Sequence, residues 1–401
     1  ALWRLPFVRA GLGRELVRKI QTAGGAIAII VICLFSFSDA YSGFFRLHKP
    51  LRYYSNPTFA LYSAGQILIR AGEVAEPTGL VRVAEDAVIP DTDTDRELII
   101  MVVGETARAD RFSLNGYGRE TNPELAGEKN LVSYTNIDAC GTSTAVSVPC
   151  MFALDGYENF NLRRAKNTEN VLVVLTRAGV SILWRDNNSG SKGVASRVAF
   201  EDFSRPDRNI VCDVECRDIG MLNGLQEYID GARGDILIVL HQMGNHGPAY
   251  FKRYPPEYER FVPACQYEEL SRCTDEEIGN AYDNAIVYTD YFLGRVIGLL
   301  KDNTPRFETA MFYVSDHGES LGEKGLYLHG MPIVLAPEEQ TEVPVIVWVG
   351  DTSDIELTSA LDVRDVENSH DAVSHSLLSA FEVDTEILAE EKALFVINER
   401  G

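Results

Sequence analysis

The stretch from Leu98 to Thr106 reads Leu-Ile-Ile-Met-Val-Val-Gly-Glu-Thr. Its first six residues are apolar and rich in β-branched side chains, a pattern that predicts a β-strand. The strand ends at Gly104, and the carboxylate of Glu105 follows directly. In an open α/β sheet, ligands bind at the carboxyl ends of the strands, so Glu105 lies where a ligand site is expected.

Two further apolar runs, 309–315 and 235–240, end in residues of the same kind. They are followed by Asp316-His317-Gly318-Glu319 and by His241, with Asn245-His246-Gly247 close behind. Each strand therefore delivers a side chain of the metal-binding type to one edge of the sheet. Glutamate, aspartate and histidine in this arrangement suit zinc, and a threonine oxygen can serve as a fourth ligand.

From residue 98 onward, strand and helix patterns alternate along the chain. The strand candidates are 98–103, 180–184, 235–240, 309–315 and 343–349, and the helix candidates are 168–178, 276–302 and 370–381. This alternation predicts an α/β fold with a mostly parallel central sheet flanked by helices on both faces. Ser369, His370 and His375 near the end are interpreted as a helix cap and a helix face rather than as ligands.

A loop rich in hydroxyl groups lies between two cysteines at residues 140–151, which read Cys-Gly-Thr-Ser-Thr-Ala-Val-Ser-Val-Pro-Cys-Met. A hydroxyl at the start of a helix meets free backbone N–H groups and a positive dipole end, which suit an anion. The loop could therefore carry a nucleophile that accepts a phosphoryl group. The alternative is a disulfide-stapled loop with a Ser or Thr helix cap. The residues alone do not distinguish Thr142, Thr144 and Ser147.

The composition limits the class of protein. The chain has 401 residues, 45% of them hydrophobic, and a formal net charge of −22, so a nucleic-acid partner is not expected. Cys33 lies in an apolar run, and the other six cysteines form the close pairs 140/150, 212/216 and 265/273. Such pairs favour three local disulfides in an oxidising compartment, whereas reduced thiols or a cysteine-rich zinc site are the alternatives.

The N-terminal part has the features of a membrane anchor. Basic residues occur throughout 1–19, and residues 20–38 carry no charge over a length that just spans a bilayer. The positive charge places 1–19 in the cytoplasm, and everything after the span then lies in the periplasm. A signal peptide is the alternative. Residues 39–90 form an expected juxtamembrane linker, in which 41–75 are aromatic and basic with a helix over 57–71, and 91–401 form the catalytic domain. The aromatic and basic side chains favour the membrane interface, and an ordinary linker packed on the domain is the alternative.

Four motifs together resemble one family. They are Gly104-Glu105-Thr106, the loop between Cys140 and Cys150, His241-Gln-Met-Gly-Asn-His-Gly-Pro-Ala-Tyr250 and Ser315-Asp-His-Gly-Glu-Ser-Leu-Gly322. From about Phe44 to its end, the chain resembles the phosphoethanolamine transferases of Gram-negative bacteria. These belong to the alkaline phosphatase/sulfatase superfamily and include the lipid A modifiers that confer polymyxin resistance. The family has about five membrane helices, of which we expect this chain, which begins at Ala1, to hold only the last.

The resemblance also implies roles for individual residues. Thr144 is the nucleophile, and Glu105, Thr144, Asp316 and His317 hold one zinc ion. His246 and His329 match positions that bind substrate phosphate or a second zinc, and Asn188 and Lys192 match residues that contact the phosphoethanolamine group. A polar surface turn is the alternative for Asn188 and Lys192. Glu319 follows Asp316 and His317 and is expected to hydrogen-bond to a ligand side chain and orient it. His241 is interpreted as a satisfied structural histidine.

The implied reaction transfers phosphoethanolamine from phosphatidylethanolamine to lipid A, or to a related envelope glycan, through a phosphoethanolamine–threonine intermediate. The protein is expected to act as a monomer in the inner membrane, with its catalytic domain in the periplasm. The alternatives are a hydrolase or glycerophosphate transferase of the same superfamily, and an inactive membrane-anchored binding protein. A sulfatase is disfavoured because the Cys-x-Pro-x-Arg pattern is absent.

Overall fold

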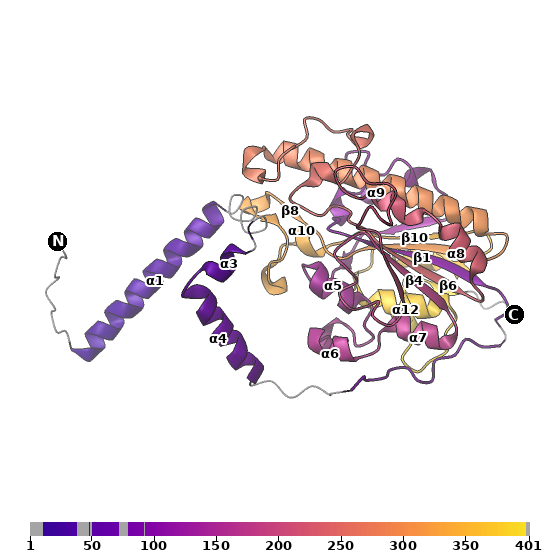
Figure 1. Cartoon of the computed structure of the whole chain (residues 1–401), viewed down its shortest axis with the longest axis horizontal. Helices are drawn as coiled ribbons and strands as arrows, with labels where there is room; N and C mark the ends of the chain where they lie inside the picture. Colours follow the sequence, from indigo (N-terminus) through magenta and orange to yellow (C-terminus); the bar gives the residue numbers. More distant parts are fainter. Residues whose placement is uncertain (1–10, 38–47, 49, 72–78, 92, 398–401) are drawn as a thin grey trace.

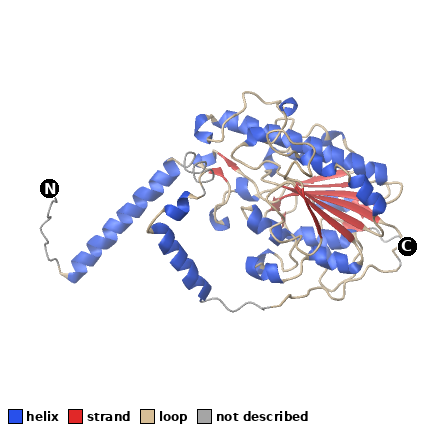
Figure 2. Ribbon diagram, in the orientation of Figure 1, coloured by secondary structure: helices blue, strands red, loops and turns tan. Residues whose placement is uncertain are grey.

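The computed structural model describes residues 11–37, 48, 50–71, 79–91 and 93–397. Of the stretch expected at the membrane interface, 39–47, 49 and 72–78 lie outside the described residues, as do residue 38 of the expected span and the basic residues of 1–10. Figures 1 and 2 show a sheet domain with helices on both faces, and two longer helices near the N-terminus.

A seven-stranded sheet forms the centre of the domain, in the order β2-β10-β7-β1-β6-β4-β5. Its strands are β1 (Glu97–Gly104), β2 (Leu131–Tyr134), β4 (Ser181–Asp186), β5 (Ala199–Asp202), β6 (Ile236–His241), β7 (Glu308–Ser315) and β10 (Val345–Val349). The run from β7 to β5 is parallel throughout, which confirms the expected α/β fold. The strand expected over 343–349 is β10, and it is antiparallel to both of its neighbours.

Three short two-stranded ribbons lie outside the central sheet. They are β3 (Ile137–Asp138) with β12 (Asn368–Ser369), β8 (Ser320–Leu321) with β9 (Tyr327–Leu328), and β11 (Ile355–Glu356) with β13 (Val396–Ile397). The first and second ribbons follow the carboxyl ends of central strands, so they help to shape the edge on which the site lies.

Helices cover both faces of the sheet (Figure 1). They are α5 (Thr144–Met151), α6 (Leu162–Asn167), α7 (Val171–Ala178), α8 (Leu225–Gly231), α9 (Asp275–Asn303), α10 (Glu338–Thr341), α11 (Leu357–Val363) and α12 (Asp371–Ala380). Alternate residues of β1 point to opposite faces, as the pleat requires. Ile100 packs in one core with Ile286 of α9, and Met101 packs in the other with Leu377 of α12.

The longest helix, α9, begins at a capping box. The Thr274 hydroxyl accepts the backbone N–H of Glu277, whose side chain in turn accepts the N–H of Thr274. This arrangement satisfies two of the free N–H groups at the helix start. The helix then crosses the sheet and presents Ile286 and Leu293, both fully buried, to the strands.

The helix expected over 20–38 is longer toward its N-terminus. It is α1 (Leu12–Ser36), within which Gly13–Leu34 is long and apolar enough to cross a membrane. Its apolar side chains are exposed, with Ile20 63% and Ile32 64% exposed. The basic residues continue the helix because lysine and arginine are good helix formers, and Lys19 lies 3.6 Å from Glu15 one turn away. Two helices follow, α3 (Leu51–Tyr54) and α4 (Thr58–Ala71).

The segment 79–90, which precedes the expected boundary at residue 91, contacts the sheet domain. Val81 forms a bridge with Thr168, and its N–H donates to the carbonyl of Asn167. Val88 exchanges backbone hydrogen bonds with Asp384 at the other end of the chain. The segment 79–90 is therefore strapped onto the sheet domain through its backbone, and only the part of 39–90 before it can act as a linker.

Candidate active site

The carboxyl ends of β1 and β7 bring three candidate ligands together. Gly104 pairs with Ser315, so Glu105, Asp316 and His317 leave adjacent strands at the same level. Their ligand atoms lie within 4.8 Å of one another, and all three residues are fully buried. Nε2 of His317 lies 3.5 Å from Oδ2 of Asp316 and 3.7 Å from Oε1 of Glu105.

Glu105 is the centre of the hydrogen-bond network. Its Oε2 accepts the Thr144 hydroxyl at 3.0 Å and Nδ2 of Asn188 at 2.7 Å, and its Oε1 accepts the Thr106 hydroxyl at 2.5 Å. Burial alone would raise the pKa of Glu105, but the imidazoles of His246 and His317 outweigh it and hold that pKa below its usual value. The carboxylate is thus kept ionised beside the Thr144 hydroxyl.

Asp316 and His317 each have one side-chain atom that is hydrogen-bonded and one that is not. Oδ1 of Asp316 accepts the backbone N–H groups of Thr106 and His317, and Nδ1 of His317 lies 2.9 Å from the carbonyl of Gly318. The proton on Nδ1 leaves Nε2 as a lone-pair donor. Oδ2 of Asp316 and Nε2 of His317 are buried with no hydrogen-bond partner. Burial and the Glu105 carboxylate raise the pKa of Asp316 well above its usual range, so a cation bound here would favour its ionised form.

The three candidate hydroxyl groups in and after the loop before α5 donate to different acceptors. Thr142 donates to the carbonyl of Met331 at 2.6 Å, and Ser147 donates to the carbonyl of Gly141 at 2.8 Å. Thr144, the first residue of α5, donates to Glu105 instead. Ser143 is the N-cap residue, but it makes no side-chain cap bond. Of the three hydroxyls that the sequence left open, that of Thr144 faces the carboxylates.

Two links hold this loop against the sheet. Cys140 and Cys150 form a disulfide, and the N–H of Cys140 donates to Nδ1 of His370, whose Nε2 in turn donates to the carbonyl of Ser315. Burial lowers the pKa of His370 to about 4, so the ring stays neutral and keeps this direction of bonding. His370 is the N-cap residue of α12, and both of its ring nitrogens are hydrogen-bonded within the protein. The pairs 212/216 and 265/273 are also bonded, and Cys33 is free.

His246 and His329 also lie next to Glu105, and the ring of His329 is 4.2 Å from that of His317. Ligand atoms of Glu105, His246 and His329 lie within 4.8 Å of one another, and the rings of these two histidines are 5.9 Å apart. Nδ1 of His329 lies 3.2 Å from Oε1 of the buried Glu319, which orients the ring from behind. The site thus offers two overlapping sets of donors that share one carboxylate.

The comparisons with known proteins agree with this geometry. A model of the sulfatase family matches residues 97–383, and a model described as phosphoethanolamine transferase EptA/EptB matches residues 1–71. Phosphatidylethanolamine transferase Mcr-2 of Escherichia coli is 44% identical over 395 residues, which cover 96% of this chain and 72% of that protein. The chain belongs to the phosphoethanolamine transferase family.

Solved structures of this family have the same fold. The integral membrane lipooligosaccharide phosphoethanolamine transferase A of Neisseria meningitidis aligns with a TM-score of 0.77 and 31% identity, covering 97% of this chain and 74% of that one. The periplasmic domain of phosphoethanolamine transferase EptC of Campylobacter jejuni aligns with a TM-score of 0.71 and 40% identity, covering 79% of this chain and 97% of that one.

One histidine of this transferase differs from expectation. Nδ1 of His241 lies 2.8 Å from Oδ2 of Asp186, but its Nε2 is buried with no hydrogen-bond partner. The expectation of a satisfied structural histidine is therefore wrong for this atom. A carboxylate behind Nδ1 and a bare Nε2 is the arrangement of a metal-binding imidazole. The position of His241 at the end of β6, next to β1, was the available signal.

Backbone strain at Thr106 is another feature of the transferase site. Thr106 has a φ of +59°, which is uncommon for a β-branched residue. Its N–H, hydroxyl and carbonyl are all bonded, to Asp316, Glu105 and Tyr282 respectively. Just before it, a side chain on Gly104 would meet the Tyr313 hydroxyl at 2.6 Å. The chain thus turns sharply here so that Thr106 can hold both carboxylates.

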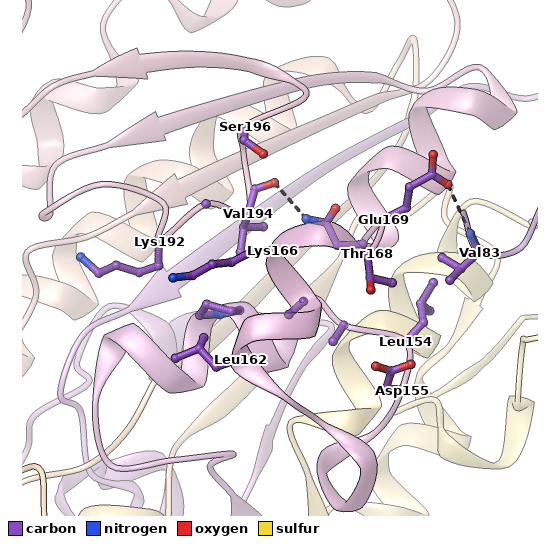
Figure 3. A pocket seen from close by; sticks show the side chains of 15 residues that line it. Val83, Leu154, Asp155, Leu162, Lys166, Thr168, Glu169, Lys192, Val194 and Ser196 are labelled. Atoms are coloured by element: carbon purple, nitrogen blue, oxygen red, sulfur yellow. Dashed lines mark hydrogen bonds between the residues drawn. The ribbon is translucent and has the colours of Figure 1, made fainter. Parts of the chain in front are cut away.

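Asn188 and Lys192 have different surroundings. Asn188 uses both of its N–H donors within the protein, on Glu105 and on the carbonyl of Gln242. Lys192 donates to the carbonyl of Ser189 at 2.9 Å and lines a separate cavity of about 230 Å³ behind α5, together with Lys166 (Figure 3). The structure therefore joins Asn188 to the carboxylates and leaves Lys192 at the rim of a neighbouring hollow.

Proposed function

We propose that this transferase moves phosphoethanolamine from phosphatidylethanolamine to lipid A or to a related envelope glycan. One observation carries the proposal. The Thr144 hydroxyl lies at the start of α5, 3.0 Å from Glu105, beside two buried ligand atoms of Asp316 and His317 that lack partners. A held hydroxyl next to a strong cation site is what a phosphoryl-accepting nucleophile requires.

The same donors suit zinc. Two carboxylates, one neutral imidazole and one hydroxyl form a four-donor set of the type that holds this ion. Glu105, Thr144, Asp316 and His317 would hold it, and His241 is a further donor at the same edge. When bound, zinc lowers the pKa of a coordinated hydroxyl and stabilises negative charge on the phosphoryl oxygens.

The transfer has two steps. In the first, Oγ1 of Thr144 forms a bond to phosphorus while the bond from phosphorus to the glycerol oxygen breaks. The hydroxyl proton leaves toward Oε2 of Glu105, and diacylglycerol departs with a proton supplied by an imidazole of the His246–His329 pair. In the second step, an oxygen of the acceptor forms a bond to phosphorus and gives its proton to that imidazole, while the bond from phosphorus to Oγ1 of Thr144 breaks and Oγ1 regains its proton from Glu105.

The remaining residues hold the reacting groups. Asn188 fixes the carboxylate of Glu105, and Glu319 fixes His329. Lys192 supplies a positive charge for the phosphoethanolamine phosphate once its bond to Ser189 is exchanged. Such positioning is the main contribution a protein makes to phosphoryl transfer.

The protein acts at the inner membrane with its catalytic domain in the periplasm. Helix α1 serves as the anchor, and the three disulfides suit the oxidising periplasm. We expect a monomer, since the described site takes all of its donors from one chain. In this assignment, 1–19 face the cytoplasm, the span is 20–38, and 39–90 lead to the catalytic domain, with 79–90 packed against it.

The test is a search for the covalent intermediate. After incubation of the protein with zinc and phosphatidylethanolamine, intact-protein mass spectrometry should show one phosphoethanolamine adduct, located on Thr144 by peptide mapping. Thr144→Ala should carry none, whereas the matched variant Thr142→Ala should keep it. Adduct formation by Thr144→Ala would contradict the assignment. Release of free phosphoethanolamine without a modified glycolipid would favour the hydrolase alternative.

A further inference from the structure

An apolar loop projects next to the site. Residues 330–337, here called the apolar loop, read Gly-Met-Pro-Ile-Val-Leu-Ala-Pro and carry no charge. They follow His329 directly. Val334 is 85% exposed and Leu335 is 68% exposed, and no other large hydrophobic side chain in the described part of the chain is as exposed as Val334. A contiguous exposed apolar segment of this kind marks an interaction site.

The base of the apolar loop is held firmly. The buried side chain of Gln340 accepts the N–H of Met331 at 3.3 Å and donates to the carbonyl of Leu328 at 3.0 Å. The hydroxyl of Thr142 donates to the carbonyl of Met331. Since Thr142 lies two residues before Thr144, the loop and the nucleophile share one support.

A second group of exposed apolar side chains lies near the carboxyl end of β4. Val214, 72% exposed, lies within the segment closed by the Cys212–Cys216 disulfide, and Ile210, also 72% exposed, lies two residues before it. The side chain of Asn187, which follows β4, donates to the carbonyl of Cys216 at 3.0 Å. In the sheet, β7, β1, β6 and β4 are neighbours in this order. The apolar loop follows β7 along the chain, and the second apolar group contacts the end of β4, so the two groups lie at the two ends of this run of strands.

We propose that the apolar loop inserts Val334 and Leu335 into the interface of the lipid bilayer and so holds Thr144 at the depth of the phospholipid headgroups. The occupant is a membrane for two reasons. First, the chain carries α1, a helix that is long enough to span a bilayer, and α4, which follows it in the sequence, also exposes the apolar side chains of Leu61 and Leu68. Second, a protein with a net charge of −22 is repelled by anionic lipid, so its contact must be apolar and uncharged, as this loop is.

The first test measures insertion directly. The full chain with Cys33→Ser, which removes the free thiol, receives Val334→Cys or, as a control, Val88→Cys, and each thiol is labelled with an environment-sensitive fluorophore. Val88 is 52% exposed and bonds to Asp384, near the amino end of β1. In vesicles of phosphatidylethanolamine and phosphatidylglycerol, position 334 should shift to the blue and be quenched by brominated lipid, whereas position 88 should not. An aqueous signal at 334, or a shift that occurs without vesicles and grows with protein concentration, would overturn the proposal.

The second test rests on the proposed function. Val334→Glu with Leu335→Glu should lower transfer from vesicle phosphatidylethanolamine by roughly tenfold or more, mainly through KM, because the lost burial of two side chains is worth at least that factor. Cleavage of a water-soluble phosphoethanolamine ester should stay within about twofold. Val88→Glu should change neither rate. Unchanged vesicle transfer in the double variant would contradict the inference. Wild-type protein that is inactive on both substrates would instead refute the proposed function, and the fluorescence result would still decide membrane contact.

Discussion

At the scale of single residues, the site contains more negative charge than its own hydrogen bonds can stabilise. Glu105 and Asp316 are both fully buried, and the nearest cationic groups are imidazoles rather than lysine or arginine. Two buried carboxylates cannot both be ionised without a counter-charge. A metal ion bound between them would supply this counter-charge.

Replacement of Asp316 by asparagine should separate metal binding from folding. Wild-type protein should gain about 2.7 kcal/mol of unfolding free energy at a zinc concentration one hundred times Kd. Asp316→Asn should lose this gain but melt above wild type in the absence of metal, because the cost of burying the Asp316 carboxyl group next to Glu105 is removed. Thermal melts with and without zinc measure both effects, with the exposed Asp302→Asn as control. Zinc stabilisation retained in Asp316→Asn would exclude this residue as a ligand.

At the scale of elements, the position of the nucleophile depends on how α5 is attached. The Cys140–Cys150 bridge and the His370 contact fix the turn before Thr144, and both act from outside the ligand set. A helix of eight residues has little stability by itself, so its start is placed by these links.

Removal of that bridge should therefore affect activity more than removal of another. Cys140→Ser with Cys150→Ser should lower kcat by ten- to a hundredfold, because a small displacement of a nucleophile is costly. Cys265→Ser with Cys273→Ser should leave kcat within about threefold. Each pair should lose roughly 2–3 kcal/mol of stability, since both loops are short. Rates and melting temperatures measured together test this, and equal losses of kcat would contradict it.

The sequence predicted the long apolar strands well and the short ones poorly. All five strand candidates exist, because β1, β6, β7 and β10 are buried on both faces and show as apolar runs. The edge strand β5 was missed, since Phe200 is 44% exposed and two acidic residues complete the strand. The direction of β10 could not be predicted, because a strand buried on both faces has the same pattern in either orientation. The open Nε2 of His241 depends on packing that no local pattern encodes.

At the scale of the whole molecule, acidic residues also gather at the amino ends of the strands, opposite the site. A cavity of about 1210 Å³ lies under the amino ends of the strands and is lined by acidic residues, including Glu97 and Glu382. Burial, together with Asp235 and Asp93, raises the pKa of Glu97 to about 10. Asp354, with burial, raises the pKa of Glu382 to about 8. This edge therefore retains protons near neutral pH.

Those protons should make the fold less stable as the pH rises. Between its ordinary pKa and about 10, folded Glu97 keeps a proton that the unfolded chain has lost, so stability falls with increasing pH through this window. The slope is at most about 1.4 kcal/mol per pH unit for one group. Glu97→Gln should flatten the decline between pH 5 and 9 and raise Tm at pH 8, whereas the exposed Glu257→Gln should not. Melting curves across this range decide it, and an unchanged slope in Glu97→Gln would show that the group titrates normally.

The strap formed by residues 79–90 sets where the independent domain begins. Asp86 accepts the Thr385 hydroxyl at 3.0 Å and a backbone N–H from Glu386, and Val81 and Val88 add backbone bonds. A fragment that starts at Gly79 keeps these contacts, and one that starts at Asp91 loses them.

At about 0.5–1.5 kcal/mol for each hydrogen bond, the shorter fragment should be less stable by roughly 2–5 kcal/mol, a large share of the ~5–15 kcal/mol typical of a domain. Both fragments should bind zinc, because every proposed ligand follows residue 104, and neither should modify lipid A in cells, because the membrane tether is lost. Urea unfolding of the two purified fragments is the measurement. Equal midpoints and slopes would mean that the strap contributes nothing and that the domain begins at residue 91.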